Sequence, residues 1–127
     1  MRTLAQEIGA RAEAVVAARL VAEGWTILGR NVHVGRAEID ILAVEPPSGA
    51  GRSSSLVVVE VRWRRRRDFG LPEETVDRAK LARLRTAAMA LRDGAGPTGL
   101  GVPALPIRVD LVAVEPAGRI RHHRGVG

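Results

Sequence analysis

The run from Leu56 to Trp63, LVVVEVRW, constrains the fold of this chain more than any other stretch. Its four valines make it the strongest strand in the sequence, because β-branched residues favour extended backbone. A helical stretch at about 72–92 follows, and then a second strand at 107–114. A strand, a helix and a further strand in this order predict a right-handed crossover with the two strands parallel. We therefore expect residues 56–63 in the centre of a sheet.

Three further segments precede this crossover. Apolar residues at helical spacing predict a helix at about 3–23, and two runs rich in β-branched residues predict strands at about 25–28 and 37–44. Gly29 and Asn31 are expected to end the first of these strands. Short connections favour an antiparallel meander. The predicted order is αβββαβ, an α/β fold with a mixed sheet flanked by helices.

A chain of 127 residues fits one compact domain. We expect this domain to span residues 1–115, followed by a basic and flexible tail at 116–127. No stretch approaches the roughly 20 apolar residues needed to span a bilayer, and the first residues lack the apolar run of a signal peptide. The chain has no cysteine. These features lead us to expect a cytoplasmic protein without a membrane segment.

The two strands at 37–44 and 56–63 place two carboxylates together. If their hairpin is symmetric about residue 50, facing residues sum to about 100, so Asp40 lies opposite Glu60 and Glu38 opposite Arg62. Glu38 and Arg62 can pair as ions, but like charges directly opposite destabilise a sheet. Asp40 and Glu60 are then expected either to keep a proton at a raised pKa or to hold a divalent cation. The alternative is that both acids merely solvate an exposed face.

The charge balance indicates an anionic partner. The chain has 20 basic and 14 acidic residues, a net charge of +6 and a pI near 11.4, which favour nucleic acid. Only Trp25, Trp63 and Phe69 are aromatic, which favours contacts with the nucleic acid backbone over base stacking.

Four consecutive arginines directly follow the strand that carries Glu60. This position places them at the mouth of the site, so we expect them to contact phosphate, although a basic run can also be only a solvated face. The four are Arg64, Arg65, Arg66 and Arg67.

Several ordered motifs resemble one protein family. They are Glu13 in the first helix, GWTILGRN at 24–31, AEID at 37–40, VEVR at 59–62, Lys80, and RVD at 108–110. The chain resembles the bacterial YraN-like proteins, which look like members of the PD-(D/E)XK nuclease superfamily, whose core is αβββαβ. The resemblance covers roughly residues 8–114.

The resemblance implies metal-assisted hydrolysis of phosphodiester bonds. Asp40, Glu60 and the backbone carbonyl of Val61 would bind Mg²⁺ or Mn²⁺. Glu13 would be a further acid acting through water, and Glu38 would border the site. The ion would activate water and neutralise charge on the phosphate.

Two positions depart from the family pattern. Ala37 replaces a glycine, a change that a strand tolerates. More importantly, Arg62 stands where the motif Glu-x-Lys has its catalytic lysine, and a guanidinium cannot transfer a proton. Lys80 is the only lysine in the chain and lies on the inward face of the second helix. Its ammonium is expected either to approach the acids or to lie over apolar surface.

Two functions follow from these residues. One is a metal-dependent nuclease acting on DNA, with branched or other structured DNA among its candidate substrates. The other is a nucleic-acid-binding protein with a degenerate site, a hypothesis motivated by Arg62. A homodimer is left open as the oligomeric state.

Overall fold

The computed structural model describes residues 1–49, 53–63, 77–94 and 100–126. The helices and strands along the chain are α1 (Leu4–Ala22), β1 (Thr26–Val34), β2 (Ala37–Glu45), β3 (Ser55–Trp63), α2 (Arg78–Arg92), β4 (Ile107–Val114) and β5 (Ile120–His123). This is the predicted αβββαβ order with one strand added, so the α/β fold class is confirmed. Within these ranges no helix is long and apolar enough to cross a bilayer.

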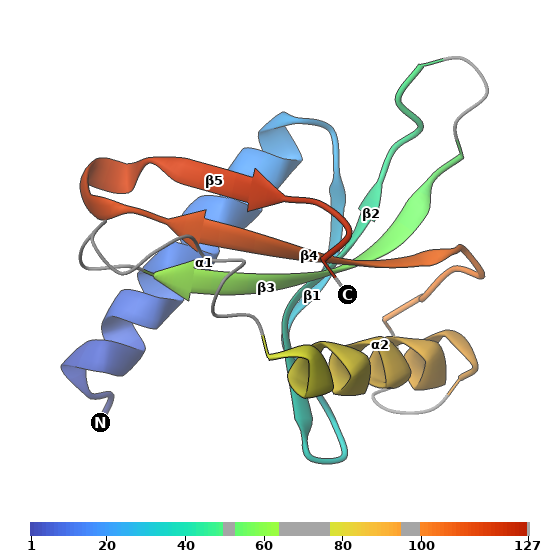
Figure 1. Ribbon diagram of the computed structural model, residues 1–127, viewed down its shortest axis with the longest axis horizontal. Helices are drawn as coiled ribbons and strands as arrows, with labels where there is room; N and C mark the ends of the chain where they lie inside the picture. Colours follow the sequence, from blue (N-terminus) through green and yellow to red (C-terminus); the bar gives the residue numbers. More distant parts are fainter. Residues whose placement is uncertain (50–52, 64–76, 95–99, 127) are drawn as a thin grey trace.

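The strands form one mixed sheet in the order β1-β2-β3-β4-β5. β3 and β4 are parallel, as the crossover predicts, and the other neighbours are antiparallel. Successive residues of the central strand β3 face opposite sides: Leu56 and Val58 pack with α2, whereas Val57 and Val59 pack with α1. The two helices therefore cover opposite faces of the sheet (Figure 1).

Two element boundaries differ from those predicted. β1 continues through Gly29 and Asn31, because a bulge follows Ile27 and Asn31 adopts a left-handed φ of 52° that an asparagine tolerates. α2 begins at Arg78, because Asp77 is extended and its side chain caps the helix by accepting a hydrogen bond from the Lys80 N–H (3.1 Å). The predicted first turn around Pro72 lies outside the described residues.

The prediction of a flexible tail at 116–127 is wrong for residues 116–126, the part that the structure describes. Residues Pro116–Gly118 form a 3-10 turn, and β5 pairs with β4 over residues 111–114. The Val126 N–H then donates to the Val109 carbonyl at 2.9 Å. The sheet thus extends by a strand into the segment expected to be free.

Side chains also anchor this C-terminal segment, through a set of residues that we call the Asp110 cluster. Asp110 is fully buried and accepts hydrogen bonds from Arg108 Nε and Nη2 (both 2.8 Å) and from the Gly125 N–H (3.0 Å), and it contacts His122 Nε2 at 2.8 Å. Arg108 Nη1 also donates to Glu45 at 2.7 Å. The other members are Arg124, which donates to Glu45, and Trp25, whose ring lies 5.9 Å from the Arg108 guanidinium and 5.8 Å from that of Arg124.

Candidate active site

The candidate site lies where β2 and β3 separate. Their ladder runs from Glu45–Ser55 to Ile41–Val59, and each pair sums to 100, so the predicted register is confirmed over these residues. Beyond Ile41, β2 continues along β1 as far as Ala37. At this fork the Asp40 carboxylate accepts a hydrogen bond from the Val61 N–H at 2.9 Å. The Asp40 side chain thus accepts the hydrogen bond of a β3 backbone N–H that lies past the end of the β2–β3 ladder.

The predicted strand pair of Glu38 with Arg62 is wrong, for the same reason. Glu38 lies opposite His33 on β1, past the point where the β2–β3 ladder ends. Its side chain is exposed. Arg62 lies two residues after Glu60 on β3 and is partly exposed.

Asp40 and Glu60 form a carboxyl pair, and Glu60 is only 6% exposed. Burial, a hydrogen bond with Glu60 and the negative charge of Glu60 together raise the pKa of Asp40 to about 8, against the lowering effect of the Val61 N–H. The contact with Glu60 therefore favours a proton shared by the pair. The direction agrees with the raised pKa expected from the sequence, and the bound cation stays a prediction.

Glu13 brings a further carboxylate to the fork from α1. Burial raises its pKa, while Arg30 and a hydrogen bond from Asn31 oppose that effect and the charges of Glu38 and Glu60 reinforce it. Glu13 Oε1 is buried and accepts no hydrogen bond from the described residues, and Arg30 Nη2 lies 3.8 Å from it. The structure thus brings together the four acids expected near the site.

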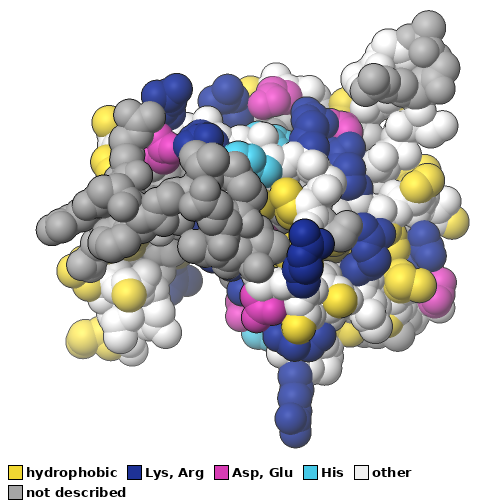
Figure 2. All heavy atoms as spheres, in the orientation of Figure 1, with side chains coloured by type: hydrophobic (Ala, Val, Ile, Leu, Met, Phe, Trp, Pro, Cys, Tyr) yellow, Lys and Arg dark blue, Asp and Glu magenta, His cyan; other side chains and the backbone are white. Residues whose placement is uncertain are grey.

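Basic side chains face these acids from α2 and from the β1–β2 turn. Lys80 Nζ lies 2.9 Å from Glu60 Oε2, and the two form an ion pair without hydrogen-bond geometry. Of the two positions expected for the ammonium, the structure thus has the one beside the acids. A cavity of about 270 Å³ opens here; its lining includes Arg36, Glu38, Asp40, Lys80 and Arg83. Figure 2 shows basic side chains spread over α2 and down to the tip of the β1–β2 hairpin, with acidic side chains beside them.

Sequence reasoning does not single out Arg30, Arg36 and Arg83. Arg83 follows Lys80 by three residues on a helix, a spacing that puts both on one face and could have identified it. Arg36 lies in a turn, and Arg30 follows a bulge, so periodicity identifies neither.

The predicted phosphate-binding run is not placed by the structure. β3 is described as far as Trp63, and the description resumes only at Asp77. The contact of this run with phosphate therefore stays a prediction. All four of its arginines lie outside the described residues: Arg64, Arg65, Arg66 and Arg67.

The acids suit a hard divalent cation, although they are not arranged as a finished site. In the described ranges no three His, Asp or Glu side chains form a ready metal-binding group. Mg²⁺, however, is often bound by one or two carboxylates with water completing the shell. A cation at Asp40 and Glu60 would take the place of the proton on Asp40 and of the Lys80 ammonium beside Glu60. The buried, unbonded Glu13 Oε1 is a further oxygen near this position.

Fold and site together define a small α/β protein with a carboxyl pair at a fork between two strands. The model of the uncharacterised protein family UPF0102 matches residues 12–114, and the chain belongs to this family. It is 39% identical over 125 residues to a UPF0102 protein of Arthrobacter sp., covering 94% of this chain and 95% of the relative. It is 37% identical to one of Symbiobacterium thermophilum, covering 93% and 92%. UPF0102 is the family of the YraN-like proteins, so the resemblance to those proteins that the motifs indicated is confirmed.

Proposed function

We propose that this protein is a metal-dependent nuclease that hydrolyses phosphodiester bonds of DNA. The observation that carries the proposal is the Asp40–Glu60 carboxyl pair: Glu60 is buried, its presence raises the pKa of Asp40, and Lys80 Nζ lies 2.9 Å from Glu60 Oε2. Strongly perturbed acids in a cavity with adjoining cations are typical of functional sites. The place of the family within the PD-(D/E)XK superfamily belongs to this proposal.

The residues have distinct tasks in such a reaction. Asp40 and Glu60, with the Val61 carbonyl, would hold Mg²⁺ or Mn²⁺. When bound, the ion would lower the pKa of water and offset charge on the phosphate. Arg36 and Arg83 line the cavity and would bind phosphate oxygens through their planar guanidinium groups.

Lys80 would supply the positive charge that the motif normally places at position 62. Its ammonium stands at Glu60 now, and release from Glu60 on cation binding would leave it beside the phosphate. An ammonium can also give or take a proton, whereas the guanidinium of Arg62 cannot. The substitution at position 62 is therefore compatible with activity if Lys80 carries this role.

Cleavage of DNA in the presence of Mg²⁺ or Mn²⁺ tests the proposal. The wild-type protein should nick supercoiled or branched DNA, and Asp40→Asn and Glu60→Gln should each lower the rate by at least about 100-fold, roughly 2.7 kcal/mol. Chelation should remove the activity. Asp93→Asn, the same change at an exposed position after α2, is the matched control and should cut normally. Equal cleavage by wild type and Asp40→Asn would reject these roles.

A nucleic-acid-binding protein with a degenerate site is the second candidate, favoured by Arg62. Two variants separate the two functions. Arg62→Lys restores the motif and should increase cleavage if the site is a weakened enzyme. Lys80→Arg keeps the charge but removes proton transfer, so retained cleavage would assign Lys80 an electrostatic role. Salt-sensitive binding with no cleavage by any variant would establish the binding protein instead.

A further inference from the structure

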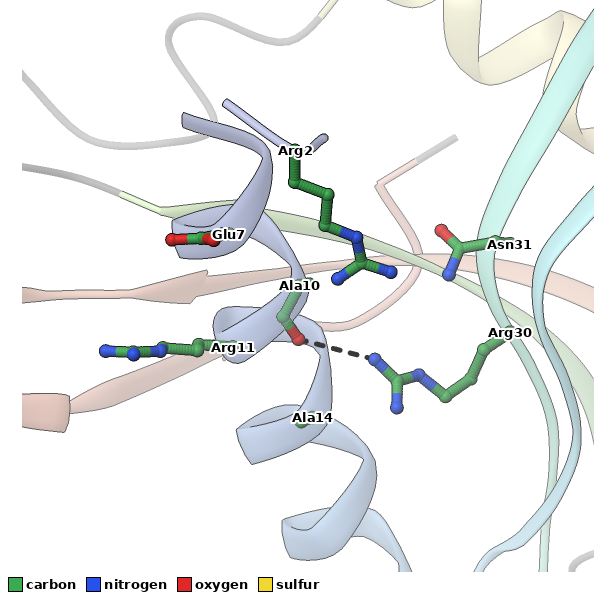
Figure 3. Close-up of a pocket in the computed structure, with 7 residues that line it drawn as sticks. All are labelled: Arg2, Glu7, Ala10, Arg11, Ala14, Arg30 and Asn31. Carbon is green, nitrogen blue, oxygen red and sulfur yellow. Dashed lines mark hydrogen bonds between the residues drawn. The ribbon is translucent and has the colours of Figure 1, made fainter. Parts of the chain in front are cut away.

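A second cavity lies between α1 and β1, the two elements that carry Glu13 and Arg30. Its volume is about 550 Å³, roughly twice that of the cavity at Asp40. Figure 3 shows the side chains of Arg2, Arg30 and Asn31 converging in the space between α1 and β1. Arg11 and Glu7 also line this cavity but project from the other side of the helix.

The converging groups are all hydrogen-bond donors for an anion. Two guanidinium forks match phosphate oxygens, and the Asn31 amide adds N–H donors. Arg30 is held in place, because its Nη2 donates to the Ala10 carbonyl at 3.4 Å and lies 3.8 Å from Glu13 Oε1. Among the described residues that line the cavity none is aromatic, so stacking on bases has no platform here.

Position connects this cavity to the carboxyl pair. Glu13, beside Arg30, acts electrostatically on both Asp40 and Glu60. A nucleic acid strand with one phosphate at Asp40 and Glu60 would therefore continue past Glu13 toward Arg30 and Arg2. The volume lies in the usual range of ligand pockets, about 300–1,000 Å³, which suits nucleotide-sized groups better than a single ion.

The geometry points to a backbone-binding groove: Arg2, Arg30 and Asn31 bind the sugar–phosphate backbone of a nucleic acid strand that extends from the carboxyl pair. The groove binds phosphates without reading bases. The inference rests on the proposed function only for the direction of the strand, since the groove itself needs no cleavage to bind.

The dependence of DNA affinity on salt tests the groove. Binding is measured with a labelled duplex in EDTA, in an Asp40→Asn background, so that no cutting interferes. Each lost phosphate contact lowers the magnitude of the slope of log K against log[salt] by about 0.9. Arg2→Ala and Arg30→Ala should each show this loss, equally on unrelated sequences. Asn31→Gly suits the left-handed backbone and should weaken binding with the slope unchanged.

Arg19→Ala is the matched control, because Arg19 lies on α1 outside the groove and pairs with Glu23. Its slope should equal that of the background protein. Arg2 lies before the helix on the surface, so Arg2→Ala reports on binding even if Arg30→Ala disturbs folding. Slopes unchanged in Arg2→Ala and in folded Arg30→Ala would overturn the groove, even if wild-type cleavage depends on Asp40. Reduced slopes without any cleavage would support the groove and reject the proposed catalysis.

Discussion

Asp110→Ala should lower the free energy of unfolding by about 3–5 kcal/mol, the usual effect of removing one partner of a buried ion pair. Asp110 is fully buried and accepts hydrogen bonds from Arg108 and from the Gly125 N–H. Without it the Arg108 guanidinium loses two of its acceptors in a partly buried position. Urea denaturation at neutral pH measures the change. Asp93→Ala, at an exposed position, should change stability by less than about 0.5 kcal/mol.

The destabilisation caused by Asp110→Ala should become smaller in acid. Burial alone would raise the pKa of Asp110, but hydrogen bonds from His122, Arg108 and Gly125 outweigh it and lower the pKa to about 2. A carboxyl whose folded pKa is depressed stabilises the protein above its unfolded pKa of about 3.9 and loses that contribution as pH falls. The gap between wild type and Asp110→Ala should therefore narrow from about pH 4 to pH 2. An equal gap at both pH values would mean that packing, not charge, holds the cluster.

The order of the elements could be predicted from the sequence because each of them has a local pattern. The valines of β3 and the helical spacing in α1 and α2 are readable without any knowledge of distant contacts. β5 has no such pattern. Its sequence IRHH is polar and short, and side chains help to hold it: His122 contacts Asp110 twelve residues earlier, and Arg124 just beyond the strand reaches Glu45. Long-range ion pairs leave no periodic signal, so the sequence predicts a tail where the structure has a strand.

The convergence of Asp40 and Glu60 could also be predicted, since the two residues lie one step past the last ladder pair, Ile41–Val59. The predicted pairing of Glu38 with Arg62 was wrong, because the register of two strands does not show where their ladder ends. The cations around the acids are harder to identify. With 19 arginines in the chain, composition does not distinguish those that line a cavity. Lys80 is recognisable only because it is the single lysine.

Asp40→Asn should make the metal-free protein more stable, although the same change is expected to abolish cleavage. Burial beside Glu60 raises the pKa of Asp40 to about 8, so folding becomes less favourable as pH rises above the unfolded pKa of about 3.9. The amide carries no charge, keeps an acceptor for the Val61 N–H and can donate to Glu60. The variant should exceed wild type by up to about 5 kcal/mol near pH 9, because each of the roughly four pKa units corresponds to about 1.4 kcal/mol.

The sign of this effect distinguishes a functional pair from a structural one. The advantage of Asp40→Asn should grow between about pH 4 and pH 8 and level off above that, as thermal or urea unfolding in EDTA would measure. Addition of Mg²⁺ or Mn²⁺ at about pH 8 should then stabilise wild type and leave the variant unchanged, because a bound cation stabilises only the folded form that binds it. Asp93→Asn should follow wild type in both measurements. A variant less stable than wild type at every pH would mean that favourable contacts hold the Asp40 carboxylate, and that its burial beside Glu60 does not destabilise the folded protein.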